Sequence, residues 1–228
     1  MSIAALPPRG PADRDGARLG ALREAVSAMD GARIPYLLMG GVGSAVSGRP
    51  RMTEDIDLFV EPGQGRPALD ALETAGFSTE ERDPRWLFKG WKYDVLVDVI
   101  FRSSGDIYLD AEMLERGSWH DFGGCRAHVM APEDLIVVKA ITADEHVPQH
   151  WYDALGLLAS AEIDWAYLAR RARRHGLRRT TSLLLYAESK DIWVPADVTA
   201  QLFRALNPCA VRPGGTEGTG GKEPGDGQ

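Results

Sequence analysis

The chain has 228 residues, 44% of them hydrophobic, and a formal net charge of −7 at pH 7. This length and composition are typical of a globular protein with a substantial core, and the acidic balance argues against a protein that coats nucleic acids, although it leaves room for a local basic patch. No stretch approaches the roughly 18 uninterrupted apolar residues of a membrane span. The Pro-rich start lacks the apolar core of a secretion signal, so we expect a cytoplasmic protein that does not contact membranes.

The first half of the sequence predicts an alternation of helices and strands. Residues 1–16 are rich in Pro and Gly, and we expect them to be disordered. Leu19, Leu22, Val26 and Met29 recur at helical spacing and predict a helix over residues 17–30. The elements expected next are a strand at 35–39, a glycine turn with a short helix to about residue 47, a strand at 54–60, a helix at 66–76, and strands at 85–90 and 93–101.

The second half of the sequence becomes helical. Gly123-Gly124 links two short strands expected at 118–122 and 125–130. After them we expect helices at 132–143, 148–160, 164–175, 177–188 and 196–206. The pattern predicts an α+β fold: a small mixed β-sheet core flanked by helices over residues 17–131, followed by a helical region over 132–211. Residues 212–228 contain no apolar residue, so we expect a flexible tail.

Two carboxylates one residue apart stand in the strand expected at 54–60. Side chains alternate between the faces of a strand, so Asp55 and Asp57 project side by side. Neighbouring carboxylates repel each other unless a cation lies between them, and a divalent metal ion is the obvious candidate. Upstream, the apolar run 36–39 ends in Gly40-Gly41, where a glycine turn that opens a helix would present backbone amides to a phosphate group.

The segments 39–44 (Met-Gly-Gly-Val-Gly-Ser) and 51–58 (Arg-Met-Thr-Glu-Asp-Ile-Asp-Leu) resemble the signature of the DNA polymerase β-type nucleotidyltransferase superfamily. That signature is an apolar residue, Gly, Gly or Ser, roughly a dozen further residues, and then Asp, an apolar residue, Asp or Glu, and an apolar residue. Such families carry a third carboxylate on a later strand, and the apolar run 93–100 supplies Asp98. The resemblance implies catalytic and metal-binding roles for Asp55, Asp57 and Asp98, and nucleotide-binding roles for Gly40, Gly41 and Ser44.

Two of the candidate site residues have structural alternatives. Asp98 interrupts an apolar strand, where an unpaired carboxylate is costly, so a buried salt bridge to an arginine, or an edge strand with one face in water, would also explain it. Arg51, just before the strand with the two carboxylates, could neutralise the charge of a triphosphate or substrate. It could equally pair with Glu54 or Glu61 as a solvated or structural arginine.

A second, weaker resemblance lies in the helix expected at 132–143. The run Leu-Ile-Val-Val-Lys that ends at Lys139 is similar to a helix of a nucleotidyltransferase subgroup that includes abortive-infection-type toxins. In that subgroup a lysine, and an aspartate in the following helix, belong to the active site, which implies roles for Lys139 and Asp153. The chain departs from the subgroup before Asp153, where Gln149-His150-Trp151 replaces the usual basic residues. A lysine that extends from a buried helix to solvent is the structural alternative for Lys139.

Six arginines between residues 170 and 179 form the densest basic segment. Such a segment could bind a polyanion such as tRNA. Trp165, Leu168 and Ala172 already form an apolar helical stripe, however, and this favours arginines on a solvated helix face.

The resemblance implies a Mg²⁺-dependent enzyme that transfers a nucleoside monophosphate from an NTP to an acceptor hydroxyl and releases pyrophosphate. Two metal ions about 4 Å apart would serve this chemistry, with Mn²⁺ as an alternative to Mg²⁺ and ATP among the candidate donors. The acceptor could be a small molecule, a tRNA end or a protein hydroxyl, and an antitoxin is a candidate partner if the enzyme is a toxin. The alternative is a protein that keeps the fold and binds nucleotide and metal without turnover.

Overall fold

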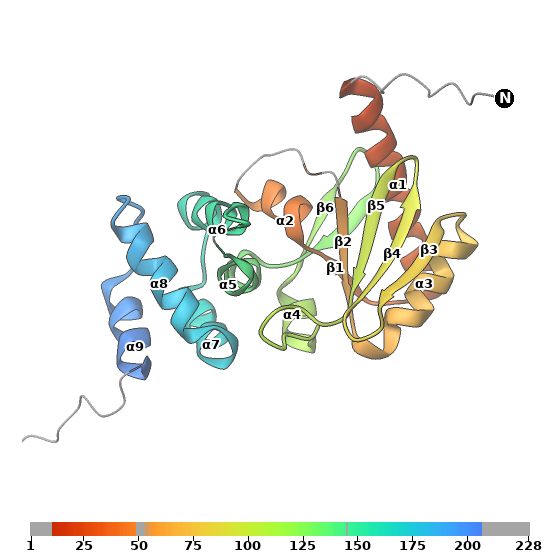
Figure 1. The fold of residues 1–228 in the computed structure, drawn as a ribbon. Helices are drawn as coiled ribbons and strands as arrows, with labels where there is room; N and C mark the ends of the chain where they lie inside the picture. Colours follow the sequence, from red (N-terminus) through yellow and green to blue (C-terminus); the bar gives the residue numbers. More distant parts are fainter. Residues whose placement is uncertain (1–10, 49–52, 54, 145, 207–228) are drawn as a thin grey trace, which may run out of the picture.

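The computed structural model describes residues 11–48, 53, 55–144 and 146–206. The strands within these residues form one sheet in the order β3-β4-β5-β2-β1-β7-β6 (Figure 1). The strands are β1 (Tyr36–Leu38), β2 (Asp55–Val60), β3 (Ser78–Asp83), β4 (Leu87–Lys92), β5 (Val95–Ile100), β6 (Ser118–Asp121) and β7 (Arg126–Val129). The α-helices are α1 (Pro11–Ala32), α2 (Gly40–Ser47), α3 (Gly65–Thr74), α4 (Ala111–Arg116), α5 (Pro132–Thr142), α6 (Gln149–Ser160), α7 (Trp165–His175), α8 (Leu177–Glu188) and α9 (Ala196–Leu206), and a 3-10 helix, η1, covers Pro62–Gln64.

The sheet is mixed, as the α+β prediction requires. β2 runs parallel to β5, and β1 runs parallel to β7. The other neighbouring pairs are antiparallel. β2 lies between β5 and β1 at the centre of the sheet, so the strand that carries the first two carboxylates is supported on both sides.

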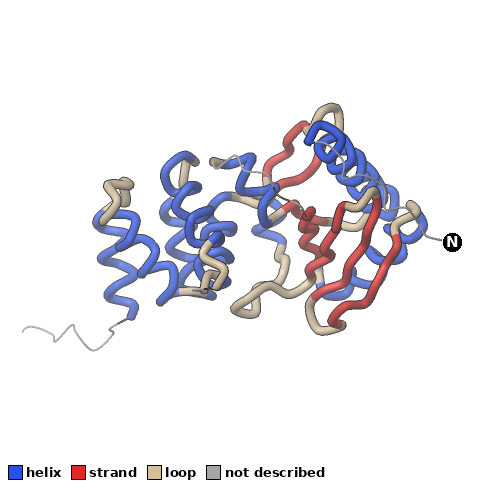
Figure 2. The backbone as a smooth tube through the Cα atoms, turned by 45° about the horizontal axis from the view of Figure 1, so that its top comes forward, coloured by secondary structure: helices blue, strands red, loops and turns tan. Residues whose placement is uncertain are grey.

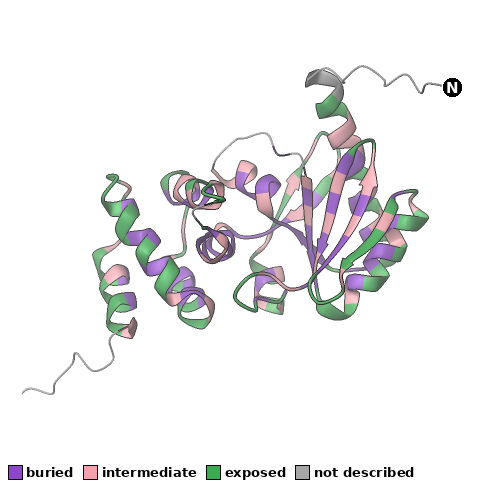
Figure 3. Cartoon of the chain, in the orientation of Figure 1, coloured by how far each residue is buried: buried purple, intermediate pink, exposed green. Residues whose placement is uncertain are grey.

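Alternation along the strands gives the sheet two different faces. Ile56, Leu58 and Val60 of β2 are fully buried in the cluster that includes α1 and α3. Phe59 points to the other face and belongs to the cluster formed by α5 to α9. Helices therefore cover both faces, and the purple segments of the strands mark this core (Figure 3).

α5 and α6 lie side by side between the sheet and α7 to α9 (Figure 1), and Figure 2 shows these helices grouped to one side of the strands. Every residue of α5 from Glu133 to Ala140 is buried, including its charged residues. One hydrophobic cluster joins this helix to Leu37 and Phe59 of the sheet and to Leu183 of α8. The predicted helical region thus shares core residues with the predicted sheet region. In the part of the chain that the structure describes, no helix has the length and apolar character needed to cross a membrane.

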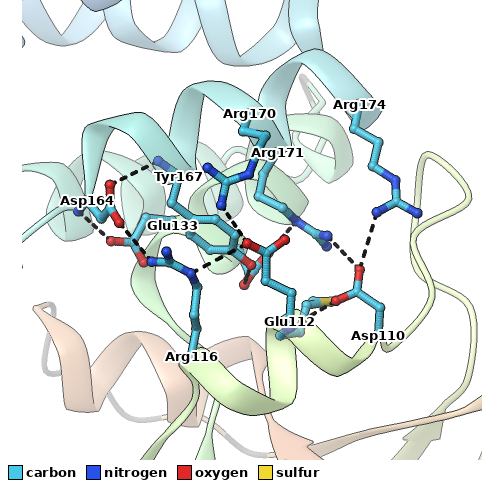
Figure 4. A network of polar contacts seen from close by, with 11 residues as sticks. Asp110, Glu112, Arg116, Glu133, Asp164, Tyr167, Arg170, Arg171 and Arg174 are labelled. Atoms are coloured by element: carbon cyan, nitrogen blue, oxygen red, sulfur yellow. Dashed lines mark hydrogen bonds and ion pairs between the residues drawn. The ribbon is translucent and has the colours of Figure 1, made fainter.

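A polar network joins the first turn of α5 to α7 and to the start of α4 (Figure 4). Arg171 of α7, only 2% exposed, forms ion pairs with Asp110 at 2.6 Å and with Asp134 at 2.8 Å. The Tyr167 hydroxyl donates to the Asp134 carboxylate at 2.7 Å, and burial raises the pKa of Asp134 to about 6. The Asp164 backbone amide donates to Glu133. A buried charge is stable only with such partners, so the network fixes how α5 is oriented.

The expectation that the arginines at 170–179 lie on a solvated face is wrong for Arg171. Arg170 pairs with Glu112 of α4, and Arg179 donates to the Ala143 carbonyl oxygen. Arg174 lies 3.7 Å from Asp110. The other five arginines of the segment are exposed, as expected of a solvated helix face, although some of them also pair with neighbouring elements.

Some elements differ from the sequence predictions. α1 begins at Pro11, so residues 11–16 are helical rather than disordered, which is reasonable because proline is tolerated in the first turn of a helix. β3 was not predicted because Ser-Thr-Glu-Glu-Arg-Asp has no apolar alternation, and α4 has only six residues, too few to show a helical period. Residues 93–94 form a hairpin turn, not the start of a strand. The predictions for residues 1–10 and 212–228 lie outside the described residues.

Candidate active site

The three predicted carboxylates come together on adjacent strands. Asp57 of β2 and Asp98 of β5 are direct partners in the parallel register, and Asp55 lies two residues before Asp57 on the same face. One carboxylate oxygen from each of Asp55, Asp57 and Asp98 lies within 4.8 Å of the other two. Each side chain is partly shielded from water. Three acids that are far apart in the sequence therefore form one cluster, as predicted.

Asp57 is the most perturbed of the three. Burial and, to a smaller extent, the nearby charges of Asp55 and Asp98 raise its pKa to about 7, although Lys139 and the Gly41 amide act in the opposite direction. Burial also raises the pKa of Asp98, against the influence of Lys89. Like charges in a partly dry site disfavour ionisation unless a cation joins them. This is the electrostatic pattern expected of a site that binds a divalent metal.

Gly40 and Gly41 make room for the carboxylates. Gly40 has a φ of +60°, and a Cβ atom there would lie 1.7 Å from Asp57 Oδ2. A Cβ atom on Gly41 would lie 2.4 Å from the Thr53 hydroxyl, and the Gly41 amide donates to the Asp57 carboxylate. The glycine pair thus begins α2 and also holds Asp57 in place.

We expect Gly40→Ala to lower activity at least about a hundredfold, because an Ångström-scale displacement of Asp57 disrupts the site. A left-handed conformation also costs a residue with a side chain about 1–2 kcal/mol, so the melting temperature falls. Gly31→Ala is the matched control, since no atom lies within 4 Å of a Cβ atom there. Turnover assays and thermal melts of both variants test this, and full activity of Gly40→Ala would contradict the close contact.

Ser44, another predicted nucleotide-binding residue, does not face the carboxylates. Ser44 is fully buried one turn into α2, and its hydroxyl donates to the Gly40 carbonyl at 2.8 Å, so it supports the turn instead of facing the cluster. Arg51 lies outside the described residues. Thr53, to which the sequence assigned no role, is buried and donates its hydroxyl to the Asp55 carboxylate. Its position two residues before Asp55, on the same side of the chain, is the signal that could have identified it.

Lys89 is a second residue that the sequence analysis missed. Its ammonium group lies 2.7 Å from Asp98 Oδ1, and the two side chains are 19% and 15% exposed. The predicted structural alternative for Asp98, a salt bridge to an arginine, is thus replaced by a salt bridge to a lysine on the neighbouring strand. Lys89 lies within the strand expected at 85–90. The register between β4 and β5 places it opposite Asp98, and the sequence alone does not give that register.

Lys139 and Asp153 form a buried ion pair next to the carboxylates. The Lys139 ammonium lies 2.9 Å from Asp153 Oδ2, and the two side chains are 3% and 0% exposed. Gln149 also donates to Asp153, at 3.2 Å. Lys139 is close enough to Asp57 to lower its pKa. The two residues implied by the weaker resemblance are therefore in contact, and Lys139 does not extend to solvent.

A cavity of about 450 Å³ opens at this cluster. This volume is in the usual range for sites that bind small molecules. Its inner wall contains Gly40, Gly41, Asp55, Asp57 and Lys139. Its outer wall is formed by the turn after β3, the segment after β5, and part of α5 and α6, with Arg85, Trp86, Arg102, Ser103, Ser104, Gly105, Asp106 and His150 among its residues.

The donor set fits a hard divalent metal ion. Mg²⁺ and Mn²⁺ prefer carboxylate oxygens, and Asp55, Asp57 and Asp98 provide them within one short span. Burial and the repulsion from Asp55 and Asp98 both raise the pKa of Asp57, and a bound cation would oppose both effects. These three residues could therefore hold the metal that the resemblance implies.

Comparisons with solved structures found overall similarity at low sequence identity. The solution structure of the antibiotic-resistance factor ANT(2″)-Ia is 16% identical, with a TM-score of 0.47 over 78% of this chain and 94% of that chain. The lincomycin-bound lincosamide antibiotic adenylyltransferase LnuA is 14% identical, with a TM-score of 0.45 over 60% and 96%. An antigenic nucleotidyltransferase-like protein from Paracoccidioides brasiliensis is 13% identical, with a TM-score of 0.46 over 86% and 95%.

The family assignment rests on a family model. No curated protein matched the chain. Residues 10–189 match the model described as "Uncharacterised nucleotidyltransferase", and this match contains Gly40, Gly41, Lys139 and all three carboxylates of the cluster. It confirms the resemblance to nucleotidyltransferases stated from the sequence. The protein therefore belongs to this family of nucleotidyltransferases.

Proposed function

We propose that this nucleotidyltransferase moves a nucleoside monophosphate from an NTP to an acceptor hydroxyl and releases pyrophosphate. The observation that carries the proposal is the cluster of Asp55, Asp57 and Asp98, of which Asp55 and Asp57 line a cavity beside the Gly40-Gly41 turn. The family match supports nucleotidyl transfer. The proposal further includes a requirement for a divalent metal, the roles of the three carboxylates and the nature of the acceptor.

Asp55, Asp57 and Asp98 would hold Mg²⁺, or Mn²⁺ in its place, and two ions would serve the reaction. A divalent metal bound there supplies Lewis-acid activation of the phosphate and lowers the pKa of an oxygen bound to it. Thr53 and the Gly41 amide keep two of the carboxylates oriented by donating hydrogen bonds to Asp55 and Asp57. Such orientation by hydrogen bonds usually determines how well a metal ligand works.

The chain's own residues account for positioning and proton transfer. The start of α2 at Gly40 places the positive end of a helix at the cavity, and Lys139 adds a cation on the same wall; both attract phosphate oxygens. The acceptor oxygen attacks the α-phosphorus, the bond from that phosphorus to the oxygen of the β-phosphate breaks, and pyrophosphate leaves. A carboxylate oxygen of Asp98 takes the proton of the hydroxyl. Burial raises the pKa of Asp98, which makes it a stronger base.

The cavity supports a small-molecule acceptor more than a polyanion. Its volume suits a ligand of that size, and Trp86 and Arg102 on the outer wall offer an aromatic ring and a cation for contacts. In the basic segment that could have bound tRNA, Arg170 and Arg171 already pair with Glu112, Asp110 and Asp134. Antibiotic modification and a toxin role are two biological versions of the same reaction, and the toxin version would bring an antitoxin partner.

Incubation with each labelled NTP and Mg²⁺ tests the proposal. Pyrophosphate release, together with a mass shift of one nucleoside monophosphate on an acceptor, is the expected result. The acceptor panel includes hydroxyl-bearing small molecules, tRNA and protein, and ATP is the first donor to use. If calorimetry shows that nucleotide and Mg²⁺ bind but no pyrophosphate is released across the panel, the non-catalytic alternative is favoured.

A further inference from the structure

Lys89 stands in a row of charged residues that crosses four strands. It lies opposite Asp98 in the β4–β5 register and opposite Glu80 in the β3–β4 register. Asp98 is in turn the partner of Asp57. Directly opposed residues of neighbouring strands share one face of the sheet, so a cation lies between a carboxylate of the active-site cluster and a carboxylate on the edge strand.

Lys89 and a divalent metal ion would compete for the same carboxylate. The Lys89 ammonium is 2.7 Å from Asp98 Oδ1, and that carboxylate is also one of the three donors of the metal-binding cluster. Two cations at one carboxylate repel each other, and the repulsion is only partly screened because both side chains are mostly shielded from water. Binding of a divalent ion therefore favours movement of the ammonium group away from Asp98.

Glu80 offers the ammonium group a second partner. Its side chain is 47% exposed, and its recorded ion pair, with Arg82, is long at 3.5 Å. The Cβ atoms of directly opposed residues lie about 4.5–5.5 Å apart, so the flexible lysine side chain can reach Glu80 by a change of rotamer. The charge of Lys89 then stays paired when Asp98 turns to the metal.

We propose that Lys89 is an exchangeable cation that occupies Asp98 in competition with a divalent metal and moves to Glu80 when the metal binds. This proposal rests on the metal site of the proposed function. It gives Lys89 and Glu80 opposite effects on metal affinity. Lys89 is a positioning residue here, because it acts through Asp98.

The test measures the affinity of the whole protein for Mn²⁺ in the absence of nucleotide. Mn²⁺ is titrated into the protein, and binding is followed by calorimetry and by electron paramagnetic resonance of free Mn²⁺. Lys89→Met should tighten Mn²⁺ binding about tenfold, because the competing cation is gone while the aliphatic part of the side chain remains. Glu80→Gln should weaken binding about threefold, because the ammonium group loses its alternative partner. In the Lys89→Met background, Glu80→Gln should have no further effect.

The chain provides matched controls for both substitutions. Lys92, on the same strand and also 19% exposed, pairs with Glu24 of α1, so Lys92→Met removes an equivalent charge away from the metal-binding cluster. Glu81, 45% exposed, pairs with Arg66, and Glu81→Gln is the counterpart of Glu80→Gln. Both controls should leave the Mn²⁺ affinity within about twofold of the unmodified protein.

The outcomes separate this inference from the proposed function. If the unmodified protein does not bind Mn²⁺, the metal site itself is wrong and the inference fails with it. If the protein binds Mn²⁺ but Lys89→Met does not tighten binding, only the role of Lys89 is overturned. If circular dichroism shows that Lys89→Met does not fold, the Mn²⁺ affinity of Glu80→Gln becomes the test. An unchanged affinity in that variant overturns the proposal.

Discussion

Asp57→Asn is expected to reduce nucleotidyl transfer by about 10³-fold or more while stabilising the protein in the presence of a metal chelator at pH 8. The activity falls because the proposed metal site loses one of its three carboxylates. The stability rises because the substitution removes one of three charges that repel each other in a partly buried cluster. A residue that served the fold alone would not show these opposite effects.

The stability gain depends on pH in a defined direction. The pKa of Asp57 is about 7 in the folded protein, well above the ordinary value of 3.8 for an aspartate in an unfolded chain. The folded state therefore binds the proton more tightly, and the contribution of Asp57 to stability is lost as the pH rises from about 4 to about 7. Asparagine has no charge to acquire, so Asp57→Asn should show little gain at pH 4 and about 2 kcal/mol at pH 8.

Chemical denaturation at both pH values, in chelator, measures this difference. Asp70→Asn serves as the control, because Asp70 pairs with Arg66 on the exposed face of α3 and its loss leaves the cluster intact. A further comparison adds Mg²⁺, which should raise the melting temperature of the unmodified protein and not that of Asp57→Asn. Unfolding of Asp57→Asn under all conditions would show that the carboxylates are structural and that the site assignment is wrong.

The carboxylates of β2 and the glycine turn could be predicted because each is recognised from residues close together in the sequence. Asp55 and Asp57 are separated by one residue on one strand, and alternation alone places them side by side. Gly40 and Gly41 mark a change from strand to helix. The reason for glycine at position 40 was harder to predict. The atom that excludes a Cβ there belongs to Asp57, and Asp57 becomes a neighbour of Gly40 only in the folded chain.

Lys89 could not be assigned because its position depends on a turn that the sequence obscures. The β4–β5 hairpin turns at Tyr93 and Asp94, which both have positive φ. Two-residue turns of this geometry usually contain Gly, so Tyr-Asp without a glycine gives no clear turn signal and suggests a continuing strand. Once the turn is placed at these two residues, Lys92 pairs with Val95 and the register brings Lys89 opposite Asp98.

Arg171 illustrates a different limit. Its neighbours in the sequence are other arginines, which is typical of a solvated helix face. Its partners Asp110 and Asp134 come from other parts of the chain, and only the packing of α7 against α4 and α5 brings them together. Long-range ion pairs leave no periodic pattern in the sequence, so periodicity alone cannot separate a buried arginine from an exposed one.

The buried pair of Lys139 and Asp153 allows a test of whether Lys139 acts on the substrate or only supports the fold. Lys139→Met removes one partner of an ion pair that is almost fully buried and leaves the charge of Asp153 to be satisfied by weaker partners such as Gln149. Breaking a buried pair in this way costs about 3–5 kcal/mol, so the melting temperature should fall markedly. Activity should fall as well, but this result alone does not distinguish the two roles.

The double variant Lys139→Met/Asp153→Leu separates them. Replacement of a buried ion pair by apolar residues of similar size is often neutral or stabilising, so the double variant should recover most of the stability lost in Lys139→Met. It should stay inactive by a factor of about 10² or more, because the cavity wall beside Asp57 still lacks the cation that attracts phosphate oxygens. Denaturation curves and pyrophosphate-release rates for the single and double variants form the test. Recovery of activity together with stability would show that Lys139 serves the fold, and the phosphate charge would then have to be balanced by the metal site and the start of α2.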